Sequence, residues 1–227
     1  MSTGQKFVTF GLYDFISNIT PGAAAIVGMI VTFPPLAQAS GIPSQLGILS
    51  FIILAFVVGR IIHSLAEKLR PRNTFRSTLN SIKQGDSSGS EIVSIEAGER
   101  FWKKCKSQFG LSDDFSDNDY LMKLLQSYFE TVPTTQVEKF QIMWTFCRNM
   151  WVVSWTMCSI SSIATVVDFY FMTLSRPSDE LALIAGTCFV SALVFGWQEE
   201  KFDELFVKYV FTDFHVSTPA PPSEDNE

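Results

Sequence analysis

The chain has 227 residues and a formal net charge of −6, with 47 % apolar and only 18 % charged residues. Two histidines exclude a His-rich metal site, and four cysteines without CxxC spacing argue against a disulfide framework or a zinc site. Long uncharged runs on both sides of a polar middle segment instead predict an all-α membrane protein with four transmembrane helices.

The N-terminal part is expected to form an interfacial helix followed by a transmembrane hairpin. Residues 1–20 carry several aromatic side chains and few charges, which is typical of a short helix on a membrane surface. Thr20 is a residue type that caps helices, and Pro21 suits the first helical position, so we expect the first span to begin there. With a second span that starts near Gln45, it makes up transmembrane hairpin one, residues 21–66.

Residues 67–148 are expected to be a cytoplasmic helical insert between the second and third spans. Cap-type residues precede predicted helices near residues 97–109 and 117–131. A further helix from about residue 135 is expected to run straight into the third span. A segment of this size is marginal for an independent domain, so we expect it to pack on other copies or on the C-terminal helix.

Residues 149–197 form the predicted transmembrane hairpin two, whose fourth span, residues 181–197, covers about 25 Å at about 1.5 Å per residue. Residues 198–216 have apolar side chains at helical spacing opposite a set of acids, which predicts a cytoplasmic amphipathic helix. Because an anionic membrane surface repels acids, its apolar stripe is expected to pack on protein. The Pro-rich, acidic residues 217–227 are expected to be disordered.

The placement of lysine and arginine predicts the orientation in the membrane. Basic residues crowd the end of the second span and the segment after it, at Arg60, Lys68, Arg70, Arg72 and Arg76. The two loops expected on the other side contain only Arg176. The insert is therefore expected in the cytoplasm. An even number of spans then places both termini there as well, in a multi-pass protein of the cell inner membrane.

A cleaved signal peptide is the main alternative for the first apolar run. Ala37, Gln38 and Ala39 resemble a signal-peptidase site after that run. The segment before the run is about twenty residues long, contains Asp14 and has only Lys6 as a basic side chain, which disfavours a signal peptide. We therefore interpret the first run as a span.

The third span carries a polar stripe on one helical face, since its members recur at steps of three and four. They are Ser154, Cys158, Ser161, Thr165 and Asp168. These residues are candidates for lining a water-filled pore, with the acid favouring cations. The alternative is that small hydroxyl residues let helices pack closely and hydrogen-bond to each other, with Arg176 as a candidate partner for the acid. The sequence leaves both interpretations open.

Other residues of the spans also have a structural and a functional interpretation. Arg60 and His63 lie one turn apart near the cytoplasmic end of the second span and are candidates for an inner gate. The simpler interpretation is that Arg60 reaches toward lipid phosphate. Small residues predict faces of close helix approach. They are Gly22, Ala25 and Gly28, Ala182 with Gly186, and Ala192 with Gly196.

A basic cluster in the insert consists of Arg100, Lys103, Lys104 and Lys106. Most such runs are a solvated helix face, and Glu96 and Glu99 lie close by. The functional interpretation is a site for an anion or an oligonucleotide.

Motifs for catalysis and cofactor binding are absent: the sequence shows no nucleophile–base pair, no phosphate-binding glycine loop and no metal cluster. We therefore expect no enzyme activity, no catalytic residue, no bound metal and no cofactor. A small-solute transporter is disfavoured because the chain shows no internal repeat and no pair of Gly/Pro-broken spans.

Three sequence features together resemble small four-span membrane proteins of prokaryotic antiviral defence systems. They are YDFISNITPG before the first span, FCRN at the end of a long insert, and KFDELFVKYVF after the fourth span. The chain resembles the channel component of the Hailong system, with the membrane component of Kiwa as a second candidate. This resemblance implies a homo-tetrameric channel that depolarises the infected cell. It also implies a soluble nucleotidyltransferase partner whose DNA oligomer product binds the cytoplasmic part and controls opening.

We therefore expect an oligomeric membrane channel that acts as an effector of antiviral defence, contacts membrane lipid and is gated by ligand or partner binding to the insert. In that scheme the basic cluster is the candidate oligonucleotide site. The alternative, from a different class, is a non-conducting membrane sensor or scaffold that recruits a soluble partner.

Overall fold

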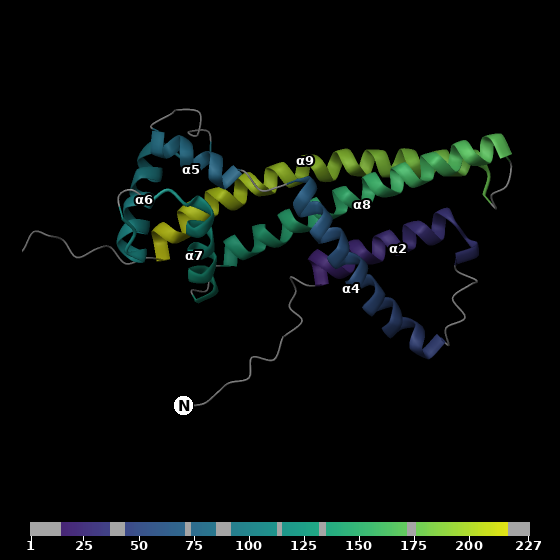
Figure 1. The fold of residues 1–227 in the computed structure, drawn as a ribbon, viewed down its shortest axis with the longest axis horizontal. Helices are drawn as coiled ribbons and strands as arrows, with labels where there is room; N and C mark the ends of the chain where they lie inside the picture. Colours follow the sequence, from purple (N-terminus) through teal and green to yellow (C-terminus); the bar gives the residue numbers. More distant parts are fainter. Residues whose placement is uncertain are drawn as a thin grey trace, which may run out of the picture. The chain divides into compact units, whose positions relative to one another are not determined.

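The computed structural model describes residues 15–36, 44–70, 74–84, 92–112, 115–131, 135–171 and 176–217 (Figure 1). In chain order its elements are η1 (Phe15–Ile19), α2 (Thr20–Thr32), α4 (Ser44–Leu69), α5 (Thr74–Gln84), α6 (Ile95–Phe109), α7 (Asn118–Thr131), α8 (Thr135–Phe171) and α9 (Ser178–Ser217). Of the described residues 91 % are helical and none lies in a strand, so the expected all-α fold is confirmed for them. Most of the predicted interfacial helix (residues 1–14) and of the predicted disordered tail (218–227) lies outside them.

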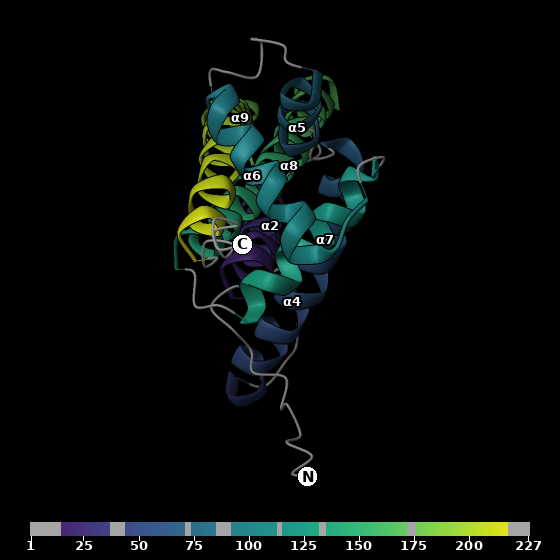
Figure 2. The same ribbon diagram turned by 90° about the vertical axis from the view of Figure 1, so that its left-hand side faces the viewer.

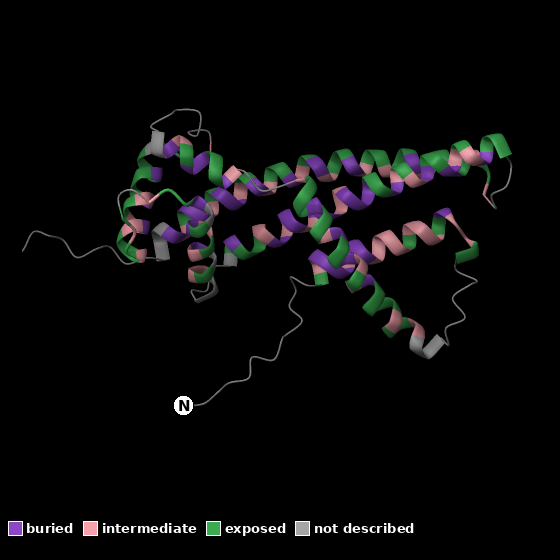
Figure 3. Ribbon diagram, in the orientation of Figure 1, coloured by how far each residue is buried: buried purple, intermediate pink, exposed green. Residues whose placement is uncertain are grey.

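Four helical stretches are long and apolar enough to cross a membrane, and they lie in η1–α2, α4, α8 and α9. Many residues along these helices are exposed (Figure 3), and large apolar side chains are among them. Strongly exposed examples are Ile48 and Ile61 on α4, Ile163 and Phe169 on α8, and Leu183 on α9. Apolar surface is unfavourable in water by about 25 cal/mol per Å² but is suited to lipid or to another protein. Length, hydropathy and exposure together indicate a multi-pass membrane protein.

The chain divides into two compact units. Unit 1 comprises Met1–Pro71 and Ile142–Glu200, and unit 2 comprises Arg72–Gln141 and Lys201–Glu227. Helix α8 runs without a break from residue 135 through the third span, as the sequence predicts. The fourth span and the C-terminal amphipathic helix, predicted as separate elements, form the single helix α9. The reason is that neither glycine nor proline follows Trp197 before the helix ends.

Glycines allow the first helices of unit 1 to pack backbone against backbone. A Cβ added to Gly22 on α2 would overlap the Ala55 carbonyl oxygen of α4, and one added to Gly59 on α4 would overlap the Asn18 carbonyl oxygen of η1. Only glycine permits such an approach, because these neighbours are backbone atoms that cannot rotate away. The core of the unit lies beside this contact and contains Ile62, Ala66, Val152, Val153 and Met157.

The other predicted close-approach faces are made at some glycines and not at others. Gly28 packs on Met157 and Gly196 packs on Trp151, where an added Cβ would come within 3.0 and 3.1 Å of those side chains. A Cβ on Gly186 would meet no described atom within 4 Å. Among the described residues the close approach predicted at Gly186 is therefore not made, because Gly186 lies on an exposed side of α9.

The start of the first span differs from the prediction. Thr20 already lies inside the helical stretch that begins with η1, so its hydroxyl donates to the Phe15 carbonyl (3.2 Å) and does not cap a helix end. Pro21 has no N–H and cannot donate to the carbonyl of Ser17, four residues earlier. The side-chain amide of Asn149 on α8 donates to that carbonyl at 2.6 Å. An amide from another helix thus gives this carbonyl a hydrogen bond that Pro21 cannot give.

Unit 2 is built around a cluster of aromatic and aliphatic side chains. Helix α6 begins after Ser94, whose hydroxyl accepts from the Ala97 N–H at 3.3 Å, and ends at Gly110, whose φ of 62° favours glycine. The ring centroid of Phe101 on α6 lies 4.1 Å from that of Phe211 on α9. Fully buried members of the cluster include Leu79, Phe101, Leu121, Leu125, Phe206 and Phe214. Helices α5, α6 and α7 gather at the C-terminal end of α9 in both views (Figure 1, Figure 2).

Candidate functional site

The polar stripe of α8 faces the interior of unit 1. Its members divide into the buried Ser154, Ser161 and Asp168 and the half-buried Cys158 and Thr165. On the opposite face of the helix, Ile163 and Tyr170 are exposed. Periodicity therefore predicts the shared face correctly, and the structure adds that this face is covered by other helices of the same chain.

Hydroxyl groups connect the stripe to α2. Ser161 Oγ lies 3.4 Å from Thr32 Oγ1. Thr32 gives its only hydroxyl hydrogen to the Gly28 carbonyl at 2.9 Å, so Ser161 is the donor between the two hydroxyls. Thr165 donates to the Ser161 carbonyl at 2.8 Å. These hydroxyls are thus hydrogen-bonded inside the protein, and two of them use helix carbonyls as acceptors.

The acid of the stripe, Asp168, is only 9 % exposed and lies near the end of α8. Its predicted partner Arg176 forms an ion pair of 2.7 Å with Glu180, at the start of α9. Arg176 and Glu180 are four residues apart, the spacing at which opposite charges meet along a helix. The spacing of four residues therefore explains why Arg176 forms its ion pair with Glu180.

The inner-gate candidates Arg60 and His63 have different surroundings. Arg60 is exposed, whereas His63 is half-buried. His63 Nε2 lies 3.3 Å from Glu67 Oε1, and His63 Nδ1 lies 3.3 Å from the Asn149 amide nitrogen. When the Asn149 amide donates one hydrogen to the Ser17 carbonyl and the other to His63 Nδ1, Nδ1 is an acceptor. A neutral imidazole then carries its hydrogen on Nε2, which faces Glu67. The structure thus joins His63 to α8 and not to Arg60.

A set of charged and aromatic residues joins α4, α8 and α9. Arg148 is buried, with its guanidinium 3.9 Å from Glu67 and 4.4 Å from the centre of the Trp144 ring. The Trp144 indole N–H donates to the buried Glu199 at 3.2 Å, and Glu199 is paired with Arg70. Buried charges are stable only when they are paired and hydrogen-bonded. We call Glu67, Arg70, Trp144, Arg148 and Glu199 the ionic network.

Sequence reasoning did not find the ionic network. In the sequence, Arg70 is one of the basic residues that predict the orientation in the membrane. Glu199 is one of several acids after the fourth span. The helical spacing of Trp144 and Arg148 is a local signal that an aromatic ring and a cation meet. The pairing of Arg70 with Glu199 joins residues 129 positions apart, which no local pattern reveals.

The four residues of the basic cluster in unit 2 differ in exposure and in the groups that they contact. Arg100 is paired with Glu96 at 3.7 Å, both on the exposed side of α6. Lys103 is exposed and Lys104 half-buried, whereas the Lys106 ammonium lies 5.5 Å from the centre of the Trp102 ring. Only part of the cluster therefore offers exposed positive charge, and Arg100 shares its charge with a carboxylate.

Comparison with known proteins does not connect these features to an established activity. No protein-family model matches the chain, and no curated protein or solved structure matches it.

Proposed function

We propose that the chain is a subunit of an oligomeric ion channel of the cell inner membrane that acts as an effector in antiviral defence. The observation that carries the proposal is the polar face of α8. From Ser154 to Asp168 this face extends over about 21 Å at about 1.5 Å per residue, which is about two thirds of the roughly 30 Å hydrocarbon thickness of a bilayer.

A polar face of that length inside a membrane span supports a path for ions. Ionisable side chains within a span are costly in lipid and commonly mark ion pathways. Ser154, Ser161 and Thr165 supply hydroxyl oxygens along the helix, and Asp168 supplies a carboxylate near one end. In the proposed channel these oxygens replace part of the hydration of a passing ion, and the carboxylate favours cations.

The proposed topology places unit 2 and both termini in the cytoplasm. Its basis is the concentration of lysine and arginine after the second span. The C-terminal part of α9 fits this topology, because Phe206 and Phe214 on its apolar side are buried in the core of unit 2 and its acids disfavour an anionic leaflet. The region around residues 67–148 is then the cytoplasmic insert of the proposal.

The defence role, the subunit number and the soluble partners of the proposal rest on the resemblance to the Hailong channel component, or to the Kiwa membrane component. The channel is proposed to be a homo-tetramer in contact with lipid, with Arg60 and His63 near its inner gate. A DNA oligomer made by a nucleotidyltransferase partner is the proposed gating ligand, and its proposed site is the basic cluster of Arg100, Lys103, Lys104 and Lys106.

Recordings from purified protein in planar bilayers test conduction through the stripe. We expect discrete cation-selective currents, with cation selectivity reduced in Asp168→Asn and conductance lowered about twofold or more in Ser161→Leu. Ser162→Leu and Asp179→Asn are matched controls, because both positions are exposed and lie outside the stripe. Ser161→Ala removes the hydroxyl but adds no volume. It therefore distinguishes the loss of a polar group in the ion path from a packing defect caused by the larger leucine.

If Asp168→Asn, Ser161→Leu and Ser161→Ala all give currents like those of the wild type, the stripe does not line the pore. Absence of discrete currents from wild-type protein in the presence and absence of candidate oligonucleotides would refute the channel itself.

A non-conducting membrane sensor or scaffold is the second candidate function. The observation in its favour is that the stripe is covered within one chain and that Thr32 and Thr165 donate to helix carbonyls. Such hydroxyls stabilise helix packing without any need for water. In this case unit 2 recruits a soluble partner, and bilayer recordings show no unitary currents.

A further inference from the structure

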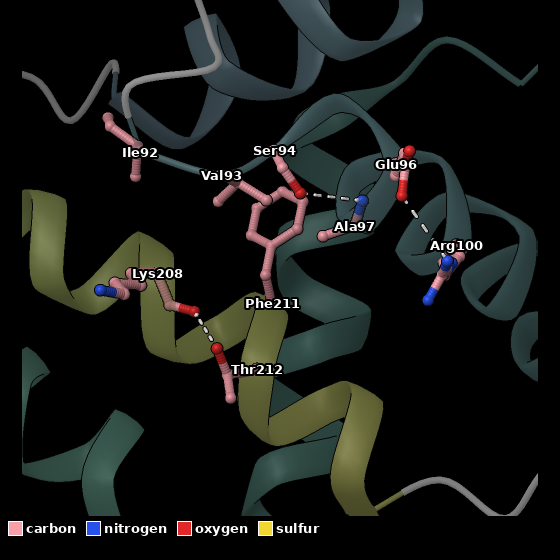
Figure 4. A pocket seen from close by; sticks show the side chains of 9 residues that line it. All are labelled: Ile92, Val93, Ser94, Glu96, Ala97, Arg100, Lys208, Phe211 and Thr212. Carbon is pink, nitrogen blue, oxygen red and sulfur yellow. Dashed lines mark hydrogen bonds and ion pairs between the residues drawn. The ribbon is translucent and has the colours of Figure 1, made fainter.

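Unit 2 contains a half-open cavity that the proposed pore does not use. Its volume is about 370 Å³, and its walls come from α6, the segment before α6 and the end of α9 (Figure 4). Cavities that hold small ligands measure about 300–1,000 Å³, so this one has room for a compact molecule but not for a polymer.

The floor of the cavity is apolar and preformed. Val93 and Phe211 are 8 % and 4 % exposed, and Ile92 and Ala97 complete the apolar lining. Phe211 is held in place by Phe101 behind it, with ring centroids 4.1 Å apart. An apolar or aromatic group that enters the cavity therefore meets a surface that needs no rearrangement.

The rim of the cavity carries two cations and one carboxylate. Arg100 and Lys208 come from different helices and lie on opposite sides of Phe211 (Figure 4). Glu96 is 3.7 Å from Arg100. The two positive charges less one negative charge leave the rim with a formal charge of +1. A ligand with one negative charge neutralises the rim. A second negative charge on the ligand would be repelled by the Glu96 carboxylate.

We infer that this cavity binds a small amphipathic monoanion, a carboxylate attached to a compact apolar or aromatic body. The apolar body lies on Phe211 and Val93, and the carboxylate pairs with Arg100 or Lys208 at the rim. This ligand class differs from the DNA oligomer of the proposed function. The inference also holds whether or not the chain conducts ions.

Ligand-observed fluorine NMR on the full chain in lipid nanodiscs tests the inference, with para-trifluoromethylbenzoate as the probe and empty nanodiscs as the blank. We expect saturable binding with a Kd of about 1 mM or tighter, and binding about tenfold weaker for the neutral para-trifluoromethylbenzamide. Lys208→Gln and Arg100→Gln are each expected to weaken binding about fivefold. Ala97→Phe fills the cavity from an exposed position and is expected to abolish binding.

Two further variants make the test specific. Lys103→Gln removes the same charge from an exposed position of α6 outside the cavity lining and should leave the Kd unchanged. Glu96→Gln should tighten binding of the benzoate, an effect that misfolding cannot produce. Equal binding of the benzamide, or unchanged binding in Ala97→Phe, would overturn the inference. So would tighter binding of the dianion para-trifluoromethylphenyl phosphate, or equal losses in Lys103→Gln and Arg100→Gln.

Discussion

At the residue scale, Gly22 and Gly59 set the distance between η1, α2 and α4. Each position faces a backbone carbonyl oxygen of a neighbouring helix, that of Ala55 or of Asn18. A side chain in the way could change its rotamer, but a carbonyl in a helix moves only with the helix. Any added Cβ therefore pushes whole elements apart, and the cost falls on all the contacts between them.

We predict that Gly59→Ala lowers the free energy of unfolding by about 1–3 kcal/mol, because overpacking outweighs the better helix propensity of alanine. The measurement is denaturant unfolding of the protein in detergent micelles, followed by circular dichroism. Gly47→Ala is the matched control on the same helix, since its Cβ would meet no described atom within 4 Å. Equal effects of the two substitutions would mean that α4 does not pack as described.

Cys105 is a residue whose chemistry follows from its place in the core of unit 2. It is fully buried, and this burial raises the pKa of its thiol above the ordinary value. A raised pKa means that less of the reactive thiolate is present at any pH below it. The thiol should therefore be protected twice, by its protonation and by the side chains that cover it.

We predict that maleimide modifies Cys105 in the folded protein at pH 8 at least about tenfold more slowly than a cysteine introduced by Lys103→Cys on the exposed side of α6. Peptide-resolved mass spectrometry measures both rates in one sample. Denaturation in SDS should bring the two rates together. Fast modification of Cys105 before denaturation would contradict its burial.

At the element scale, the ionic network connects the end of α4 to α9. Glu199 has a side chain that is 9 % exposed, and its cation Arg70 is 29 % exposed. A buried carboxylate that loses its cation keeps the cost of its desolvation without the compensating attraction. How much each substitution destabilises the protein therefore depends on how deeply the charged partner that is left behind is buried.

We predict that Arg70→Met lowers the free energy of unfolding by about 2–3 kcal/mol, which is less than the about 3–5 kcal/mol usual for a fully buried pair because Arg70 is partly exposed to solvent. The double variant Arg70→Met, Glu199→Gln should regain at least about half of this loss, since no unpaired charge remains buried. Glu200→Gln removes the exposed second partner of Arg70 and should cost less than about 0.5 kcal/mol. A double-mutant cycle with no coupling would contradict the pairing.

Element types and most of their positions were predictable from local patterns. The helix from residue 135 through the third span was foreseen because no strong helix breaker interrupts the pattern, and α8 confirms it. After Trp197 the sequence changes from apolar to acidic residues, and this change predicts a boundary between two elements. Helix continuity depends on the backbone and not on side-chain polarity, so α9 crosses that change without a break.

The candidate site was predictable only in part. A period of three to four places Ser154, Ser161 and Asp168 on one face of a helix, and the structure agrees. The hydroxyl of Thr32 opposite Ser161 comes from a segment 129 residues away. No period in one helix identifies the residue of another helix that faces it, because that depends on how the helices pack.

At the scale of the whole molecule, the sequence by itself determined the all-helical class and the four apolar stretches, because helix periodicity and hydropathy act over short distances along the chain. Only the tertiary structure decided which side of each helix is covered, which cation pairs with Glu199 and which carbonyl accepts from the Asn149 amide. These outcomes depend on contacts between residues far apart in sequence. These contacts stabilise the protein only once the helices have packed, so local sequence patterns cannot predict them.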